Sequence, residues 1–160
     1  MLNNEYLTNV IQKYSDMVYR LALTRCCNNE NAEDIFQEVF LKLSEKHPKF
    51  NDENHEKAWI IRVTINMTKN FNKSSWNRNV VELDENIVGN NDTSAINNVF
   101  DEVMKLQQEY RTVIYLFYYE GYKVKEISKM MKKSEGTIKT WLYRAREELK
   151  NKLEGGFEDE

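Results

Sequence analysis

Proline, glycine and cysteine are scarce in this chain, and it has no long apolar run. One proline, Pro48, and five glycines interrupt 160 residues, so long helices can continue without a break. No apolar run approaches the roughly 20 residues that a membrane-spanning helix needs, which argues against membrane insertion. The N-terminus lacks the basic start and apolar core of a secretory signal. The sequence therefore predicts a cytoplasmic protein.

The residue types that metal sites and catalytic centres require are also poorly represented. Cys26 and Cys27 are adjacent, which disfavours a disulfide between them and favours reduced packing residues. Their spacing relative to His47 and His55 fits no zinc pattern, so we expect no metal and no cofactor. We find no glycine-rich phosphate loop and no nucleophile–base pair, and we expect that the protein is not an enzyme.

Apolar residues recur at helical spacing along most of the chain, and no segment shows a strand pattern. In the first half we expect helices over about 5–26, from an N-cap at Asn31 to His47-Pro48, and over about 56–71. Three helices of this size can close a bundle, and we assign it to residues 1–76.

Basic residues are absent from one stretch in the middle of the chain. Residues 79–104 contain six acidic residues and neither lysine nor arginine. We predict an acidic, flexible linker over 77–94. Helical periodicity then returns and predicts a four-helix domain over 95–153, in which an apolar helix through Tyr118 is ended by Gly121 as a left-handed residue. A disordered tail is expected at 154–160. The expected fold is all-α, with two small helical domains.

Residues 124–146 have the pattern of two short helices around a tight turn. Val124, Ile127 and Met131 form an apolar face on the first helix, and Ser134 is placed to cap the second. Residues 121–146 contain eight basic and only two acidic residues, within a chain of net charge −3. A local basic block of this kind on a helix-turn-helix predicts binding to double-stranded DNA.

The candidate DNA contacts lie in the turn and on the outward side of the second helix. Arg144 offers a two-pronged donor suited to guanine, Lys139 is suited to a base or a phosphate, and Lys133 lies near the DNA backbone. The full set is Lys133, Ser134, Thr137, Lys139, Thr140, Tyr143, Arg144 and Arg146.

Two helical modules, an acidic linker and a C-terminal helix-turn-helix together resemble a bacterial sigma factor. The small size resembles the extracytoplasmic-function (ECF) group of the sigma-70 family, and the likeness covers about residues 14–153. The resemblance implies an alternative sigma factor that binds core RNA polymerase and promoter DNA at the −10 and −35 elements. It also implies an anti-sigma factor as a partner.

The first anchor of this resemblance is the segment from Asn31 to Lys42, which is similar to the family's polymerase-binding helix. The resemblance implies that Asp34, Gln37 and Glu38 face a coiled coil of the largest polymerase subunit. Their spacing of three and four residues places them along one helical edge. A row of acceptors there suits a partner rich in arginine.

The second anchor, residues 57–71, resembles the family's −10-recognition helix. The resemblance implies that an extruded base of the melted non-template strand is held between the preceding loop and this helix. An aromatic ring can stack on a base, an amide can pair with its edge, and cations can hold phosphates. For Trp59 the pattern favours a packing role over a melting wedge. The candidates are Phe50, Arg62, Asn66, Lys69 and Asn70.

The third anchor is the helix-turn-helix, in which residues 136–139 and 144–146 match the family's −35-binding helix. One departure lies at Lys132, where the family often has glycine, and we expect it to affect stability more than function. A stand-alone helix-turn-helix regulator is the alternative interpretation. Such a regulator has no need of the Gln37-Glu38 pair or of the helix that carries Asn66.

Overall fold

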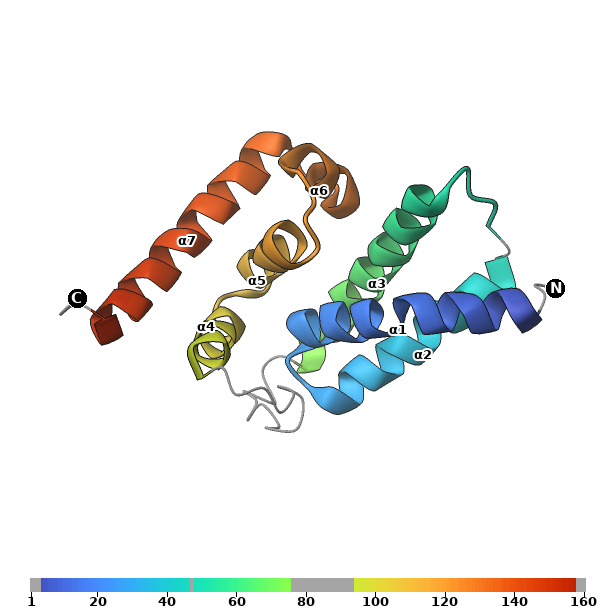
Figure 1. The fold of residues 1–160 in the computed structure, drawn as a ribbon, viewed down its shortest axis with the longest axis horizontal. Coiled ribbons are helices and arrows are strands. Elements are labelled where there is room, and N and C mark those ends of the chain that lie inside the picture. Colours follow the sequence, from blue (N-terminus) through green and yellow to red (C-terminus); the bar gives the residue numbers. More distant parts are fainter. Residues whose placement is uncertain (1–3, 47, 76–93, 158–160) are drawn as a thin grey trace. The chain divides into compact units, whose positions relative to one another are not determined.

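The computed structural model describes residues 4–46, 48–75 and 94–157, and every regular element in these ranges is a helix (Figure 1). The all-α prediction is confirmed over these ranges. The chain divides into two compact units, Met1–Val81 and Glu82–Glu160. Of the predicted linker, only its last residue falls within the described part of the chain.

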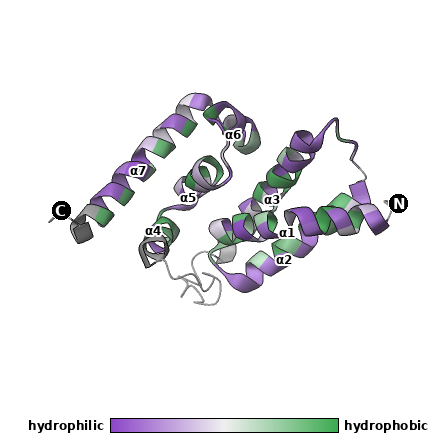
Figure 2. Cartoon of the chain, in the orientation of Figure 1, coloured by the Kyte–Doolittle hydropathy of each residue, from purple (hydrophilic) through white to green (hydrophobic). Residues whose placement is uncertain are grey.

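The first unit is a bundle of α1 (Asn4–Cys26), α2 (Asn29–Lys46) and α3 (Glu53–Ser75). Each helix packs against both others, because each carries hydrophobic residues beside hydrophilic ones along its length (Figure 2). A buried hydrogen bond joins α1 to α3, in which Arg25 Nε donates to Thr68 Oγ1 over 2.6 Å.

Two helix starts in this unit differ from the sequence prediction. The backbone N–H of Asn31 donates to Oδ1 of Asn28 at 2.9 Å, so Asn28 caps α2 and the predicted cap at Asn31 is wrong. Likewise, Asp52 Oδ1 accepts from the backbone N–H of His55 at 2.8 Å, and α3 starts at Glu53 rather than near Glu56. In both places a side chain just upstream satisfies the helix's first free N–H groups.

The second unit contains α4 (Ser94–Met104), α5 (Gln108–Ile114), a π-helical turn η1 (Tyr115–Tyr119), α6 (Val124–Met131) and α7 (Glu135–Phe157). The predicted apolar helix through Tyr118 is present, but its last turn widens into η1. Gly121 follows with φ +75°, the left-handed conformation that the sequence predicted for it. α7 continues past residue 153 to Phe157, so the first four residues of the predicted tail are helical.

The turn of the helix-turn-helix passes through a strained residue. Lys132, at the end of α6, has φ 56° and ψ 46°, a left-handed conformation that favours glycine. The Ser128 hydroxyl donates to the Lys133 carbonyl and spans the same turn. The expected discomfort at Lys132 is therefore confirmed.

We expect Lys132→Gly to raise the free energy of unfolding of the second unit by about 1 kcal/mol, because glycine adopts this conformation without a Cβ clash. Urea denaturation of the full chain measures this change. Lys129→Gly, at an exposed position in the last turn of α6, is the matched control and should destabilise by about the same amount. A loss of stability in Lys132→Gly would contradict the prediction.

Candidate protein and nucleic-acid interfaces

The outer side of α2 presents the acidic edge that the sequence predicted. Asp34, Gln37 and Glu38 are all exposed, while Ile35 and Val39 point into the bundle and are buried. The buried residues fix the rotation of the helix about its axis, and this rotation exposes the three polar side chains to solvent. We call these three residues the acidic edge of α2.

Leu41 lies on the same side of α2 and was missed by sequence reasoning. It follows Gln37 by four residues and Glu38 by three, and its side chain is 57% exposed. A leucine this exposed beside three polar acceptors is a natural apolar contact for a protein partner. Its position off the buried stripe was a signal available in the sequence.

Three of the predicted −10 contacts lie in one row on α3. Arg62, Asn66 and Lys69 are exposed and are separated by four and three residues, so they share a face. Because Asn66 is exposed, it is available to a ligand. For Asn70 the structure describes the backbone only. The half-buried ring of Trp59 lies 5.8 Å from that of Phe50, an edge-on packing contact.

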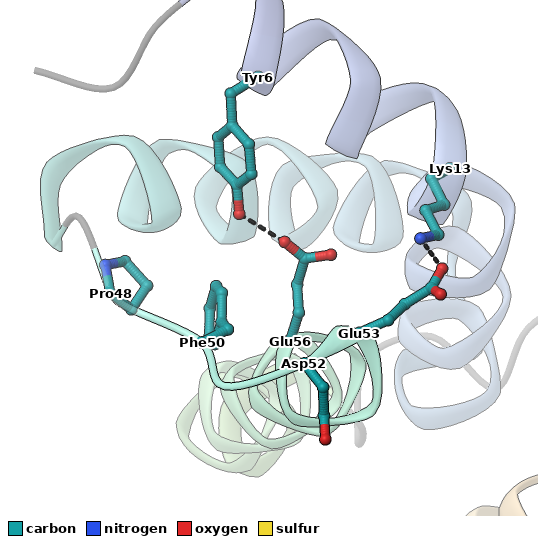
Figure 3. A pocket seen from close by; sticks show the side chains of 7 residues that line it. All are labelled: Tyr6, Lys13, Pro48, Phe50, Asp52, Glu53 and Glu56. Atoms are coloured by element: carbon teal, nitrogen blue, oxygen red, sulfur yellow. Dashed lines mark hydrogen bonds and ion pairs between the residues drawn. The ribbon is translucent and has the colours of Figure 1, made fainter.

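Phe50 lines an open pocket of about 470 Å³ between α1 and the start of α3 (Figure 3). Glu56 accepts from the hydroxyls of Tyr6 at 2.5 Å and Tyr14 at 3.0 Å, and Lys13 pairs with Glu53. Burial, followed by the Glu56 contact, raises the pKa of Tyr6 above its ordinary value, so its phenol stays protonated to a higher pH than that of an exposed tyrosine.

The pocket and the exposed row of α3 are separate places on the first unit. Asn66 is ten residues beyond Glu56 on α3, which corresponds to about 15 Å along the helix axis. Asn66 does not line the pocket. Tyr6 and Lys13 do line it, and sequence reasoning missed both, because nothing local links α1 to a loop 35 or more residues later.

The recognition helix begins with the predicted cap. The Ser134 hydroxyl accepts from the backbone N–H of Thr137 at 3.1 Å and lies 2.9 Å from the Thr137 hydroxyl. The buried side of α7 carries Ile138, Leu142 and Ala145. The side chains of the opposite side, and of the preceding turn, are exposed: Lys133, Lys139, Thr140, Tyr143 and Arg144.

Arg146 is the one predicted DNA contact on α7 with a distant partner inside the protein. Its Nε donates to the Tyr118 hydroxyl at 2.6 Å. Its guanidinium carbon lies 5.4 Å from the ring centre of Phe117 and 5.5 Å from that of Tyr118. The helix-turn-helix thus brings together the predicted set, while Arg146 is drawn toward η1.

Over the described ranges, none of the helices combines the length and the apolar character needed to cross a membrane. In the same part of the chain, no cluster of three or more histidine, cysteine, aspartate or glutamate side chains is arranged to hold a metal ion.

Comparisons with known proteins define the class of this two-unit, helix-turn-helix protein. The family model for sigma-70 region 2 matches residues 10–78, and the model for sigma-70 region 4 matches residues 97–149. The two matches together cover most of the chain, which therefore belongs to the sigma-70 family of RNA polymerase sigma factors. Its relatives, described next, place it in the ECF subgroup of that family.

Several curated relatives are ECF sigma factors. The chain is 24% identical to the ECF RNA polymerase sigma factor SigW of Bacillus subtilis, over 94% of this chain and 90% of that protein. It is 26% identical to the ECF RNA polymerase sigma-E factor of Haemophilus influenzae, over 91% of this chain and 86% of that protein.

Solved structures share the fold. The sigma factor RpoE of Bartonella quintana, determined in complex with the anti-sigma factor NepR, has a TM-score of 0.72 at 18% identity, over 92% of this chain and 96% of that one. CnrH, determined with the cytosolic domain of CnrY, has a TM-score of 0.70 at 16% identity, over 96% and 90%.

Proposed function

We propose that this chain is the promoter-recognition subunit of an RNA polymerase holoenzyme, with a separate surface for each partner. The acidic edge of α2 binds core polymerase, α3 contacts the melted −10 strand, and the helix-turn-helix binds the −35 element. Polymerase performs the catalysis. The observation that carries this assignment is the pairing of an exposed acidic edge with a basic helix-turn-helix in one family member.

The polymerase surface is supported by charge and by exposure. Asp34 and Glu38 present carboxylates, and Gln37 presents an amide. All three lie on a helix, and none of them is part of the hydrophobic core of the bundle. Carboxylates fixed in a row suit arginine, which binds them through paired N–H groups. Leu41 adds an apolar contact at the same place, which a purely electrostatic surface would lack.

The −10 surface is supported by the row on α3. Arg62 and Lys69 are one turn to either side of Asn66, so cations flank an amide on one exposed face. This arrangement suits a single strand, whose phosphates bind the cations while one base edge meets the amide. Phe50 is separated from that row, and we propose that it stacks on a neighbouring base.

The −35 surface is supported by the local charge of the helix-turn-helix. Lys133 lies in the turn, where a phosphate would lie, and Arg144 lies on the exposed side of α7. Ser134 and Thr137 stabilise the helix start, and the free N–H groups there favour an anion. Lys139, Thr140 and Tyr143 complete the side that enters the major groove.

A protein regulator is a further proposed partner. RpoE was determined in complex with an anti-sigma factor, and its fold matches this chain. We propose that an anti-sigma factor binds this chain and competes with core polymerase.

Footprinting with and without core polymerase tests the assignment. A promoter is first identified by in vitro transcription on genomic DNA with core polymerase, in which the transcription start sites are mapped. We expect protection of both promoter elements only when core polymerase is added. Protection by the chain alone, at equal strength, would instead identify a stand-alone regulator and overturn the proposal.

We expect Asn66→Ala to lower open-complex formation by about tenfold, because losing one base-edge contact costs roughly 1–3 kcal/mol. Permanganate reactivity of the melted strand measures this, and core binding should be unchanged. Since Asn66 is exposed, the melting temperature should also be unchanged. Asn9→Ala is the matched control, because Asn9 is also an exposed asparagine but lies on α1. If the Asn66→Ala holoenzyme opened the promoter DNA as fully as the wild type, Asn66 would not belong to the −10 surface.

A further inference from the structure

Arg146 and the π-helical turn η1 form a contact between segments 28 residues apart in the sequence. Besides the 2.6 Å hydrogen bond from Arg146 Nε to the Tyr118 hydroxyl, both the Phe117 and the Tyr118 rings lie within cation–π range of the guanidinium. The two rings contact each other edge-on, with centres 4.9 Å apart. We call Arg146, Phe117 and Tyr118 the arginine clamp.

The position of Arg146 on α7 explains why it reaches η1. It follows the buried Leu142 by four residues and the exposed Lys139 by seven, so it lies at the border between the buried and exposed sides. A long side chain at this border can turn toward the neighbouring element. With one edge bonded to Tyr118 and two rings beside it, the guanidinium has fewer free N–H groups for a phosphate.

η1 is itself held in place by its own side chains. The Tyr115 hydroxyl donates to Glu120 at 2.6 Å, and the Tyr115 and Tyr119 rings stack with centres 5.8 Å apart. Single π-helical turns often occur at functional places in proteins. Here the turn presents Tyr118, whose side chain is 54% exposed, toward α7.

We propose that Arg146 is a positioning residue, which fixes the rotation of α7 about its axis through the arginine clamp and thereby sets which side chains meet the bases. Successive residues of an α-helix are about 100° apart around its axis, so a small rotation moves Lys139, Tyr143 and Arg144 together. This inference rests on the proposed −35 role of α7, and it removes Arg146 from the phosphate contacts.

The test is a double-mutant cycle on the full chain, with Arg146→Ala, Tyr118→Ala and the double variant. Holoenzyme affinity is measured on a promoter obtained by start-site mapping, with a −35 base-substitution series, at several salt concentrations. We expect each single variant to weaken binding about tenfold and to flatten the base preference, with little further loss in the double variant. The salt dependence should not change.

Arg146→Lys distinguishes a phosphate contact, which needs only the positive charge, from the clamp, which needs the planar guanidinium. A lysine keeps the charge for a phosphate but lacks the planar group that bonds and stacks in the clamp. We expect it to behave like Arg146→Ala. Wild-type behaviour of Arg146→Lys, or a shallower salt dependence in Arg146→Ala with no effect of Tyr118→Ala, would overturn the inference.

A second measurement does not depend on DNA. Urea unfolding of the wild type, Arg146→Ala, Tyr118→Ala and the double variant should show that the effects of the two substitutions on stability are coupled. Additive effects of the two substitutions on the free energy of unfolding would overturn the clamp, even if the promoter footprint with core polymerase were as expected. Conversely, coupled unfolding together with DNA protection in the absence of polymerase would overturn the proposed function alone.

Discussion

Glu38→Lys is expected to abolish binding of core RNA polymerase while the chain remains folded. Glu38 is exposed on the acidic edge of α2, beside Gln37 and one turn from Asp34. Lysine would replace an acceptor by a cation facing an arginine-rich partner, and a like-charge contact in an interface costs several kcal/mol. A pull-down with core polymerase measures the loss, and circular dichroism checks the helix content.

Glu33→Lys is the matched control for this charge reversal. Glu33 is also exposed on α2 and lies about 140° around the helix axis from Glu38, although it is one turn from Gln37. We expect it to bind core polymerase almost normally and to lose at most about 1 kcal/mol of stability, since it lies in the first turns of α2. Undiminished binding by folded Glu38→Lys would remove the acidic edge from the polymerase interface.

Arg144→Ala is expected to weaken binding strongly at one base pair of the −35 element and weakly elsewhere. Arg144 is exposed on the side of α7 opposite the buried Ile138, Leu142 and Ala145. A guanidinium that pairs with both acceptors of guanine contributes about 1–3 kcal/mol of discrimination. A −35 base-substitution series with the holoenzyme measures the loss at each position.

Lys133→Ala is the control for contacts that do not read sequence. Lys133 lies in the turn before α7 and is exposed, where a cation meets the phosphate backbone. Its loss should weaken binding to all promoter variants alike and reduce the salt dependence by about one phosphate contact. If Arg144→Ala weakened every variant equally, Arg144 would be a phosphate contact of the same kind.

Local sequence signals predicted much of the fold. The apolar stripe of α2 fixed the outward direction of Asp34, Gln37 and Glu38, because helical spacing alone decides which residues share a side. Ser134 and Gly121 also behaved as predicted, since a cap and a left-handed residue act within a few positions of themselves. The cap at Asn28 was local too, but Asn31 was a plausible alternative three residues later. For α3 no cap was predicted from the sequence, and the helix starts three residues earlier than expected, after the cap at Asp52.

The sequence by itself determined the helices, the two-unit organisation and the basic helix-turn-helix, because these follow from periodicity, composition and short-range capping. Only the tertiary structure decided that Tyr6 meets Glu56 across 50 residues and that Arg146 meets Tyr118 across 28. Such contacts depend on which helices meet and how they are aligned, and the periodicity of one segment shows its buried side without identifying the partner. The same packing brings Tyr6 and Lys13 of α1 to the pocket that Phe50 lines.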